Sequence, residues 1–253
     1  MKTKGLSGLP SGRIDTLLFD LDGTIIEMQR KAEIVFYLKA FRRFRDYFNP
    51  LTFYTAFRKS VRRVRANTSE CLNYDVFVEK MAQFGRTTPQ VIDALVSDLV
   101  EKDFRSLGPF FTPVEGAREA VELARKLGYG LALVTNPVVP RKSVLYRIEW
   151  AGLDPDAFLF ITSSQNMNRC KPDIQFYERL LHRLDLKPGR CLMIGNSPAE
   201  DLPAHDAGIR TFLVETPLSA KALRKSMMDE RLDAFGTYAE LIQWMKREKP
   251  ERL

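Results

Sequence analysis

The stretch TLLFDLDGTII, residues 16–26, decides the fold of this chain. Its first four residues form a short apolar run, which is typical of a buried strand in a parallel sheet. Two aspartates, Asp20 and Asp22, follow the run directly, with Gly23 at a tight turn. Ligands of open parallel sheets bind beyond the carboxyl ends of the strands. The stretch therefore predicts a strand that leads straight into a site with two carboxylates.

Further apolar runs of the same kind occur downstream, with helical patterns between them. The runs are residues 131–134, 158–161, 191–194 and 211–214. Helical patterns cover Val114–Leu127, between Pro113 and Gly128, and Pro172–Leu184, whose apolar residues fall on one face. Strands that alternate with helices predict a doubly wound α/β fold, with a parallel sheet that is covered on both faces.

The alternation stops between the first two strands, where residues 26–110 show no convincing strand. Aromatic residues at positions 37, 41, 44 and 48 form a helical stripe, which we interpret as packing. Asn49-Pro50 ends that helix, and we expect further helices at residues 52–64, 75–84 and 89–104. The chain should therefore have a core domain of residues 1–25 and 111–253, and an all-helical cap domain of residues 26–110.

The charge of the chain is concentrated in this insert. The 253 residues carry a net charge of +7, and residues 25–66 hold 11 Lys or Arg against 3 Asp or Glu. Such a segment would attract phosphate groups, nucleic acid or an anionic membrane. A solvated helix face is the simpler interpretation, and the segment has no recognised nucleic-acid module. We therefore expect no nucleic-acid partner.

Other features point to a soluble protein of the reducing cytoplasm. No apolar run approaches the roughly 20 residues of a membrane-spanning helix, and residues 1–13 lack the apolar centre of a signal peptide. The cysteines Cys71, Cys170 and Cys191 are odd in number and scattered, which argues against disulfides and zinc. Cys170 adjoins Lys171, and a nearby cation lowers the pKa of a thiol. A redox role and plain packing are both open for Cys170, and packing is the simpler.

The two aspartates suggest a chemistry by themselves. Asp20 and Asp22 are close enough to repel each other, and a bound cation removes that repulsion. Magnesium prefers oxygen ligands and leaves room for a substrate phosphate. One carboxylate can then attack phosphorus while the other transfers protons.

The flanks of this pair resemble the first motif of the haloacid-dehalogenase-like superfamily, and three more motifs follow in order. Thr135-Asn136 resembles the second motif, Lys171 before Pro172 the third, and Gly195 to Asp201 the fourth. The resemblance covers about residues 14–30 and 111–215. It implies a Rossmann-like core with this superfamily's chemistry.

The resemblance also implies catalytic roles. Asp20 would take the phosphoryl group as an aspartyl-phosphate, and Asp22 would protonate the leaving group and then deprotonate water. Thr135 would donate a hydrogen bond to the phosphoryl group. Lys171 would keep Asp20 ionised and offset the charge of the transition state.

Binding roles follow from the same resemblance. The substrate would contact Gly23, Thr24 and Asn136. Mg²⁺ would be held by Asp20, Asp22 (through its backbone carbonyl), Asn196 and Asp201. The fourth motif departs from the family pattern, because Asn196 stands where phosphatases usually have a metal-ligating aspartate. Metal binding should therefore be weak, and Asp201, or failing that Glu200, would have to compensate.

The resemblance narrows the function without naming a substrate. An acid at position 22 is typical of the phosphatase branch and argues against dehalogenation. A helical cap directly after the first motif is similar to the phosphoglycolate-phosphatase-like branch. We expect a magnesium-dependent hydrolase of a small phosphorylated metabolite. A phosphomutase, or a binding or regulatory protein on a weakened core, are the alternatives, and the oligomeric state is open.

Overall fold

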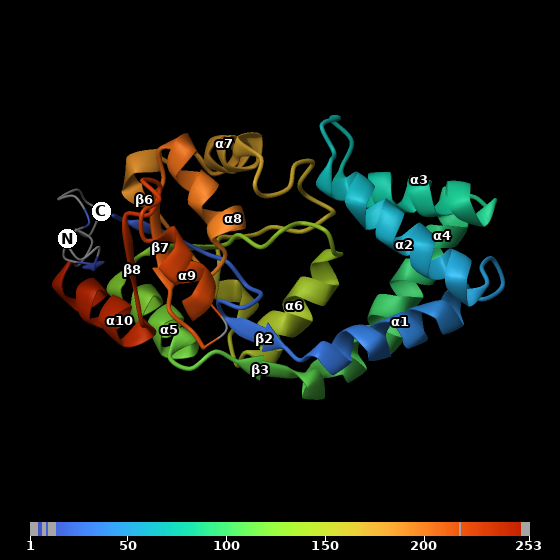
Figure 1. Ribbon diagram of the computed structural model, residues 1–253, viewed down its shortest axis with the longest axis horizontal. Coiled ribbons are helices and arrows are strands. Elements are labelled where there is room, and N and C mark those ends of the chain that lie inside the picture. Colours follow the sequence, from blue (N-terminus) through green and yellow to red (C-terminus); the bar gives the residue numbers. More distant parts are fainter. Residues whose placement is uncertain (1–4, 7–8, 10–13, 218, 249–253) are drawn as a thin grey trace.

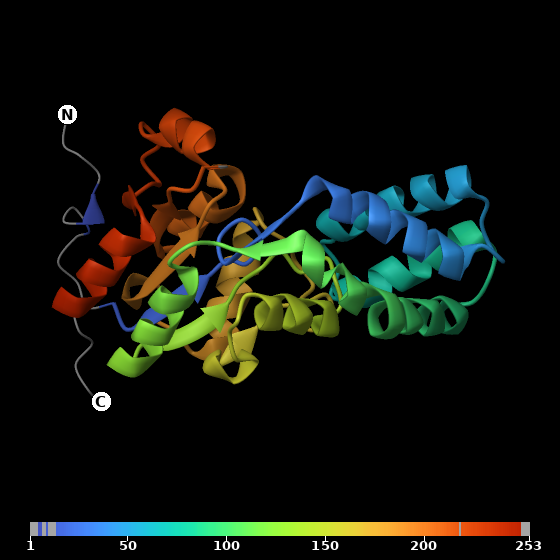
Figure 2. The same ribbon diagram turned by 90° about the horizontal axis from the view of Figure 1, so that it is seen from below.

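The computed structural model describes residues 5–6, 9, 14–217 and 219–248. An α/β core lies at one end of an elongated molecule and a bundle of helices at the other (Figures 1 and 2). Parts of the expected core domain, residues 1–4, 7–8, 10–13, 218 and 249–253, lie outside the described residues. Most of residues 1–13, for which the sequence predicts no signal peptide, therefore lie outside the described residues.

The core is built on a parallel sheet of six strands in the order β5-β4-β1-β6-β7-β8. The strands are β1 (Thr16–Phe19), β4 (Gly130–Leu133), β5 (Phe160–Ile161), β6 (Cys191–Gly195), β7 (Arg210–Val214) and β8 (Ala234–Gly236). The first five match the apolar runs of the sequence to within two residues. Because β1 lies between β4 and β6, the strand order reverses at β1, which is where such sheets bind their ligands.

Helices cover both faces of this sheet, as the sequence predicted. Along β1, Leu17 and Phe19 point to one face and pack with α5 (Ala117–Leu127), α6 (Arg141–Trp150) and α10 (Tyr238–Arg247). Leu18 points to the other face and packs with α7 (Ile174–Leu184). Leu213 of β7 packs there with α9 (Ala220–Ser226). The doubly wound α/β fold is confirmed.

The residues between β1 and β4 form the helical insert. Its helices are α1 (Arg30–Phe44), α2 (Pro50–Arg65), α3 (Asn73–Gly85) and α4 (Pro89–Asp98), followed by short π and 3-10 turns to Phe110. Asn49 begins α2 with a capping box, in which its side chain accepts from Thr52 N at 2.9 Å. The rings of Phe44 and Phe53 pack in the centre, 5.3 Å apart. The helical cap is confirmed.

Besides β8, two missed strands and two helix starts differ from the prediction. β2 (Ile26–Met28) pairs antiparallel with β3 (Phe111–Pro113), so residues 26–110 begin with a strand. The pairing continues at Val114, whose N–H donates to the carbonyl of Ile25 at 2.9 Å, so α5 begins at Ala117 and not at Val114. α7 begins at Ile174, because the side chain of Asp173 caps it by accepting from Gln175 N at 3.0 Å. The pair β2–β3 forms the junction between core and cap in Figure 1.

The cap contacts the core again at the turn between α2 and α3. The Asn73 side-chain amide donates to the backbone carbonyls of Pro137 and Arg169, at 3.2 and 3.3 Å. Arg65 of α2 forms an ion pair of 2.8 Å with Glu200, which lies in α8 (Pro198–Asp201). These contacts hold the cap against the loops that follow the strands. In the described part of the chain, no helix is both long and apolar enough to cross a bilayer.

Candidate active site

Asp20 lies directly beyond β1 and forms a buried ion pair with Lys171. Its backbone N–H donates to the carbonyl of Ile194 in β6 at 2.9 Å, which fixes the residue at the strand end. Lys171 Nζ lies 3.0 Å from Asp20 Oδ1, and the lysine side chain is fully buried. Burial raises the pKa of Asp20 to about 7, while Lys171 acts in the opposite direction. The pair predicted from two distant motifs is therefore formed.

Asp201 holds Lys171 from the other side. Lys171 Nζ donates to Asp201 Oδ1 at 2.7 Å. The other oxygen, Oδ2, accepts from the backbone N–H groups of Asn196 and Ser197, at 3.1 and 2.9 Å. Burial opposes the charge of Lys171, but Asp20 and Asp201 together raise the pKa of Lys171 above its usual value. Asp201 thus orients the lysine and the start of the fourth motif, and both of its oxygens are already engaged.

Thr24 links Asp20 to Asn196. Its buried hydroxyl lies 3.1 Å from Asp20 Oδ2 and 3.3 Å from Asn196 Oδ1. A hydroxyl has one proton to donate, so it serves one acceptor at a time. Gly23 has a φ of +82°, and a Cβ there would come within 2.1 Å of the Asn196 amide. Glycine is therefore required at position 23, both for the turn and for the approach of Asn196.

Asp22 pairs with Arg147, a residue that sequence reasoning missed. Its side chain is 52% exposed, whereas that of Arg147 is 7% exposed. Arg147 Nη1 donates to Asp22 Oδ1 at 2.7 Å, and Nε donates to the carbonyl of Ser143 at 3.2 Å. Arg147 comes from α6, about ten residues after the second motif, and so belongs to no motif that we recognised in the sequence.

The second motif lies at the end of β4, beside Asp20. Val134 N donates to the carbonyl of Phe19 at 2.7 Å, which places the buried Thr135 one residue beyond. Asn136 Nδ2 donates to the backbone carbonyl of Lys171 at 3.3 Å. Asn136 therefore braces the loop that carries Lys171. Contact of either residue with a substrate stays a prediction.

The donor groups at this edge fit a magnesium ion, although only loosely. Asp20 offers a carboxylate, Asn196 an amide oxygen and Asp22 a backbone carbonyl, all of them the hard oxygen ligands that Mg²⁺ prefers. A cation here would favour the ionised form of Asp20, whose pKa burial raises to about 7. Among the described residues, no group of three or more His, Cys, Asp or Glu side chains is arranged to hold a metal. The set fits an ion that also uses water and substrate oxygens.

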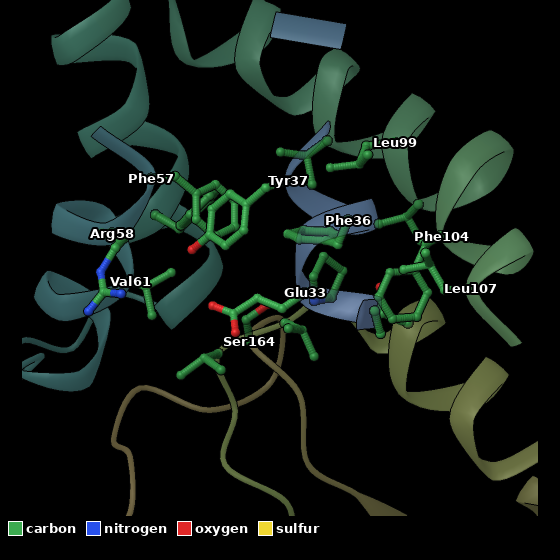
Figure 3. A pocket seen from close by; sticks show the side chains of 18 of the residues that line it. Glu33, Phe36, Tyr37, Phe57, Arg58, Val61, Leu99, Phe104, Leu107 and Ser164 are labelled. Carbon is green, nitrogen blue, oxygen red and sulfur yellow. The ribbon is translucent and has the colours of Figure 1, made fainter. Parts of the chain in front are cut away.

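A cavity of about 930 Å³ lies between this edge and the cap. Asp22 and Arg147 line it from the core, and Arg58 and Arg62 line it from α2. In Figure 3, Glu33 and Tyr37 of α1 lie in the middle of the view, between Arg58 on one side and Phe104 on the other. Nine aromatic residues line the cavity: Phe36, Tyr37, Phe44, Tyr54, Phe57, Tyr74, Phe77, Phe104 and Phe111.

Curated relatives of the chain are pyrophosphatases. The chain is similar to the pyrophosphatase PpaX of Halalkalibacterium halodurans, with 25% identity over 79% of this chain and 83% of that protein. It is also similar to PpaX of Bacillus cereus, with 22% identity over 93% of this chain and 99% of that protein. These relatives agree with the predicted phosphatase class and branch.

Solved structures share the fold at low identity. A HAD phosphatase from Thermococcus onnurineus superposes with a TM-score of 0.57 at 19% identity, over 95% of this chain and 100% of that one. A putative beta-phosphoglucomutase from Thermotoga maritima gives a TM-score of 0.54 at 20% identity, over 92% and 99%. A family model for haloacid dehalogenase-like hydrolases matches residues 14–208, which include all four motifs. The chain therefore belongs to the haloacid dehalogenase-like hydrolase family.

Proposed function

We propose that this protein is a magnesium-dependent phosphohydrolase that cleaves a small phosphomonoester through an aspartyl-phosphate on Asp20. The observation that carries the proposal is the buried contact of 3.0 Å between Asp20 and Lys171 at the end of β1. A carboxylate in an apolar site is a nucleophile only while it is ionised, and a fixed ammonium favours that form. The same ammonium lies where charge develops during phosphoryl transfer.

In the first half of the reaction, Asp20 attacks phosphorus and the alcohol leaves. Asp22 donates a proton to the leaving oxygen, for which its exposed position at the cavity is suited. Thr135, beside Asp20 at the end of β4, hydrogen-bonds a phosphoryl oxygen. In the second half, Asp22 takes a proton from water and the water attacks phosphorus. The bond between phosphorus and the Asp20 oxygen breaks, which releases inorganic phosphate and regenerates the Asp20 carboxylate.

Magnesium would be held by Asp20, the Asp22 carbonyl and Asn196, and when bound it would neutralise phosphoryl charge. Asn196 supplies no negative charge, so affinity for the metal should be low without substrate. Asp201 supports this arrangement from behind, through Lys171 and through the backbone of Asn196. Direct ligation of the metal by Asp201 stays a prediction. The hydrogen bonds that both of its carboxylate oxygens already accept do not favour it.

The experiment is an assay of free phosphate with Mg²⁺ present, over a panel of phosphomonoesters together with pyrophosphate, the substrate that the relatives' name indicates. We expect release from at least one phosphomonoester, loss of activity with a chelator, and no activity in Asp20→Asn. An isomerised sugar phosphate without free phosphate would instead identify a mutase. Absence of both products across the panel would favour a binding protein on a weakened core. The cytoplasmic location and the lack of membrane and nucleic-acid partners stay predictions.

A further inference from the structure

Arg147 is buried but incompletely paired. Its Nε and Nη1 have partners in Ser143 and Asp22. Its Nη2 is also buried, and within the described residues it has no hydrogen-bond partner. Leaving a buried donor unsatisfied costs about 1–3 kcal/mol, and more for a charged group. Arg147 lines the cavity between cap and core, so the acceptor of a ligand that enters beside the guanidinium would satisfy this nitrogen.

The pair between Arg147 and Asp22 conflicts with the chemistry proposed for Asp22. To donate a proton, the Asp22 carboxyl must give up its hydrogen bonds to Arg147 and contact the oxygen that leaves the phosphoryl group on Asp20. Arg147 would then lose its only ion-pair partner in the described part of the chain. A buried guanidinium without a counter-anion is strongly unfavourable, by several kcal/mol. Productive binding therefore requires a new anion for Arg147, and the substrate is its nearest source.

We propose that Arg147 binds an anionic group on the alcohol part of the substrate, and that this contact frees Asp22 for proton transfer. The proposal rests on the proposed function and names its substrate class. A planar guanidinium accepts a carboxylate or a phosphate through two parallel hydrogen bonds, and Nη2 is available for one of them. A substrate without a second anion would leave Asp22 held by Arg147.

The size and lining of the cavity indicate the shape and polarity of the rest of the substrate. About 930 Å³ is near the upper end for small-molecule sites, which span roughly 300–1,000 Å³. Its aromatic walls suit an apolar or aromatic body. Arg58 and Arg62 have no ion-pair partner among the described residues, while Glu33 is an acid of the cap wall, so cations exceed acids there. The expected substrate is a phosphomonoester of a bulky, largely apolar alcohol that carries an anionic group near the ester oxygen.

The test compares three esters that share an aromatic body: phenyl phosphate, 2-carboxyphenyl phosphate and 1,2-phenylene bisphosphate. The proteins are the parent, Arg147→Met, Arg147→Lys and the control Arg141→Met, whose side chain is exposed on the same helix. For each protein we take the ratio of kcat/KM between an anionic ester and phenyl phosphate, so that comparing proteins cancels the intrinsic reactivity of the esters. The two anionic esters separate carboxylate from phosphate recognition.

We expect the parent and Arg141→Met to prefer at least one anionic ester. Arg147→Met should lower that preference by about 10- to 100-fold, the usual size of a lost charge-assisted hydrogen bond. Arg147→Lys keeps the charge but not the fork, so its preference should fall by less, and it decides the question if Arg147→Met does not fold. A preference that survives in both variants, or its absence from the parent, would overturn the proposal.

A binding measurement separates this proposal from the proposed function. In the Asp20→Asn background, calorimetry should show tighter binding of the anionic esters than of phenyl phosphate, and the added Arg147→Met should remove the difference. If the parent hydrolyses no member of the phosphomonoester panel but this difference is found, the hydrolase proposal fails and the anion site stands. Equal binding of all three esters refutes the anion site whether or not turnover is seen.

Discussion

Asn196 stands where the family resemblance implies an aspartate, which leads to a prediction about the metal. Asn196→Asp replaces the neutral ligand that we propose beside Asp20 by a charged one, so the magnesium concentration for half-maximal activity should fall. A magnesium titration of activity measures it. Gln90→Glu, an exposed amide-to-acid change in the cap, is the control and should leave the titration unchanged. An unchanged metal requirement in Asn196→Asp would place the ion elsewhere.

Asp201 leads to a prediction about stability. Asp201→Asn removes one of the two carboxylates that surround the buried Lys171. Breaking a buried ion pair typically costs about 3–5 kcal/mol, and because Asp20 stays in place we expect about 3 kcal/mol of unfolding free energy. Urea unfolding gives the value. Asp206→Asn, which breaks an exposed pair with Arg231, should cost about 1 kcal/mol or less. Equal losses of unfolding free energy would mean that the buried pair of Asp201 with Lys171 stabilises the fold no more than an exposed pair does.

Lys171 and Arg147 show which single residues of the site could be predicted from the sequence and which could not. Lys171 precedes a proline in an ordered set of motifs, and the family resemblance of those motifs implied its contact with Asp20. Arg147 belongs to no motif, but its position in the sequence pattern indicates that it is buried. It falls on the helical face of Val144, Ile148 and Ala151, all of them buried, and a charged residue on such a face needs a partner. The identity of that partner depends on how the strands are ordered in space, which no spacing along the chain encodes.

At the scale of elements, helix α2 carries the prediction for the cap. Arg58 and Arg62 are one turn apart and both line the cavity. Replacing both with Gln should raise KM for anionic esters by a few fold at low ionic strength, and by less at high salt, because exposed charges are screened. Arg42→Gln is the control, since Arg42 lies in a separate surface hollow with Arg43 and Asp103. An equal rise in KM from Arg42→Gln would point to the overall charge of the cap.

The strands that were predicted and those that were missed differ in the length of the apolar run in which they lie and in their context. β1, β6 and β7 are apolar runs of four or five residues that are buried along nearly their whole length, so composition alone reveals them. β2, β3 and β8 have three residues each, too few for a period of two to show. β2 and β3 are strands only because residues about 85 positions apart pair with each other. Such pairing is a property of the tertiary fold.

For the molecule as a whole, Cys170 reports on the contact between cap and core. Its Sγ accepts from Asn73 of the cap at 3.4 Å, and burial raises the pKa of Cys170 to about 12. Packing, and not activation by Lys171, therefore explains this cysteine. In native protein at pH 8, iodoacetamide should modify the exposed Cys71 and spare Cys170 and the buried Cys191.

Peptide mass spectrometry measures the three sites separately, and unfolded protein provides the control in which all of them react. Modification of Cys170 as fast as Cys71 in folded protein would mean that the cap leaves the core readily. If Cys191 reacted as well, general unfolding would be the explanation.

The central claim is that Asp20 carries the phosphoryl group during turnover. The most direct measurement is acid quenching of the enzyme during steady-state hydrolysis, followed by mass spectrometry of the peptide that contains Asp20. The account predicts one added phosphoryl group on Asp20 in the parent. In Asp20→Asn, it predicts no such adduct and a loss of turnover of at least about a thousandfold. A phosphoryl group on another residue, or near-normal turnover in folded Asp20→Asn, would contradict it.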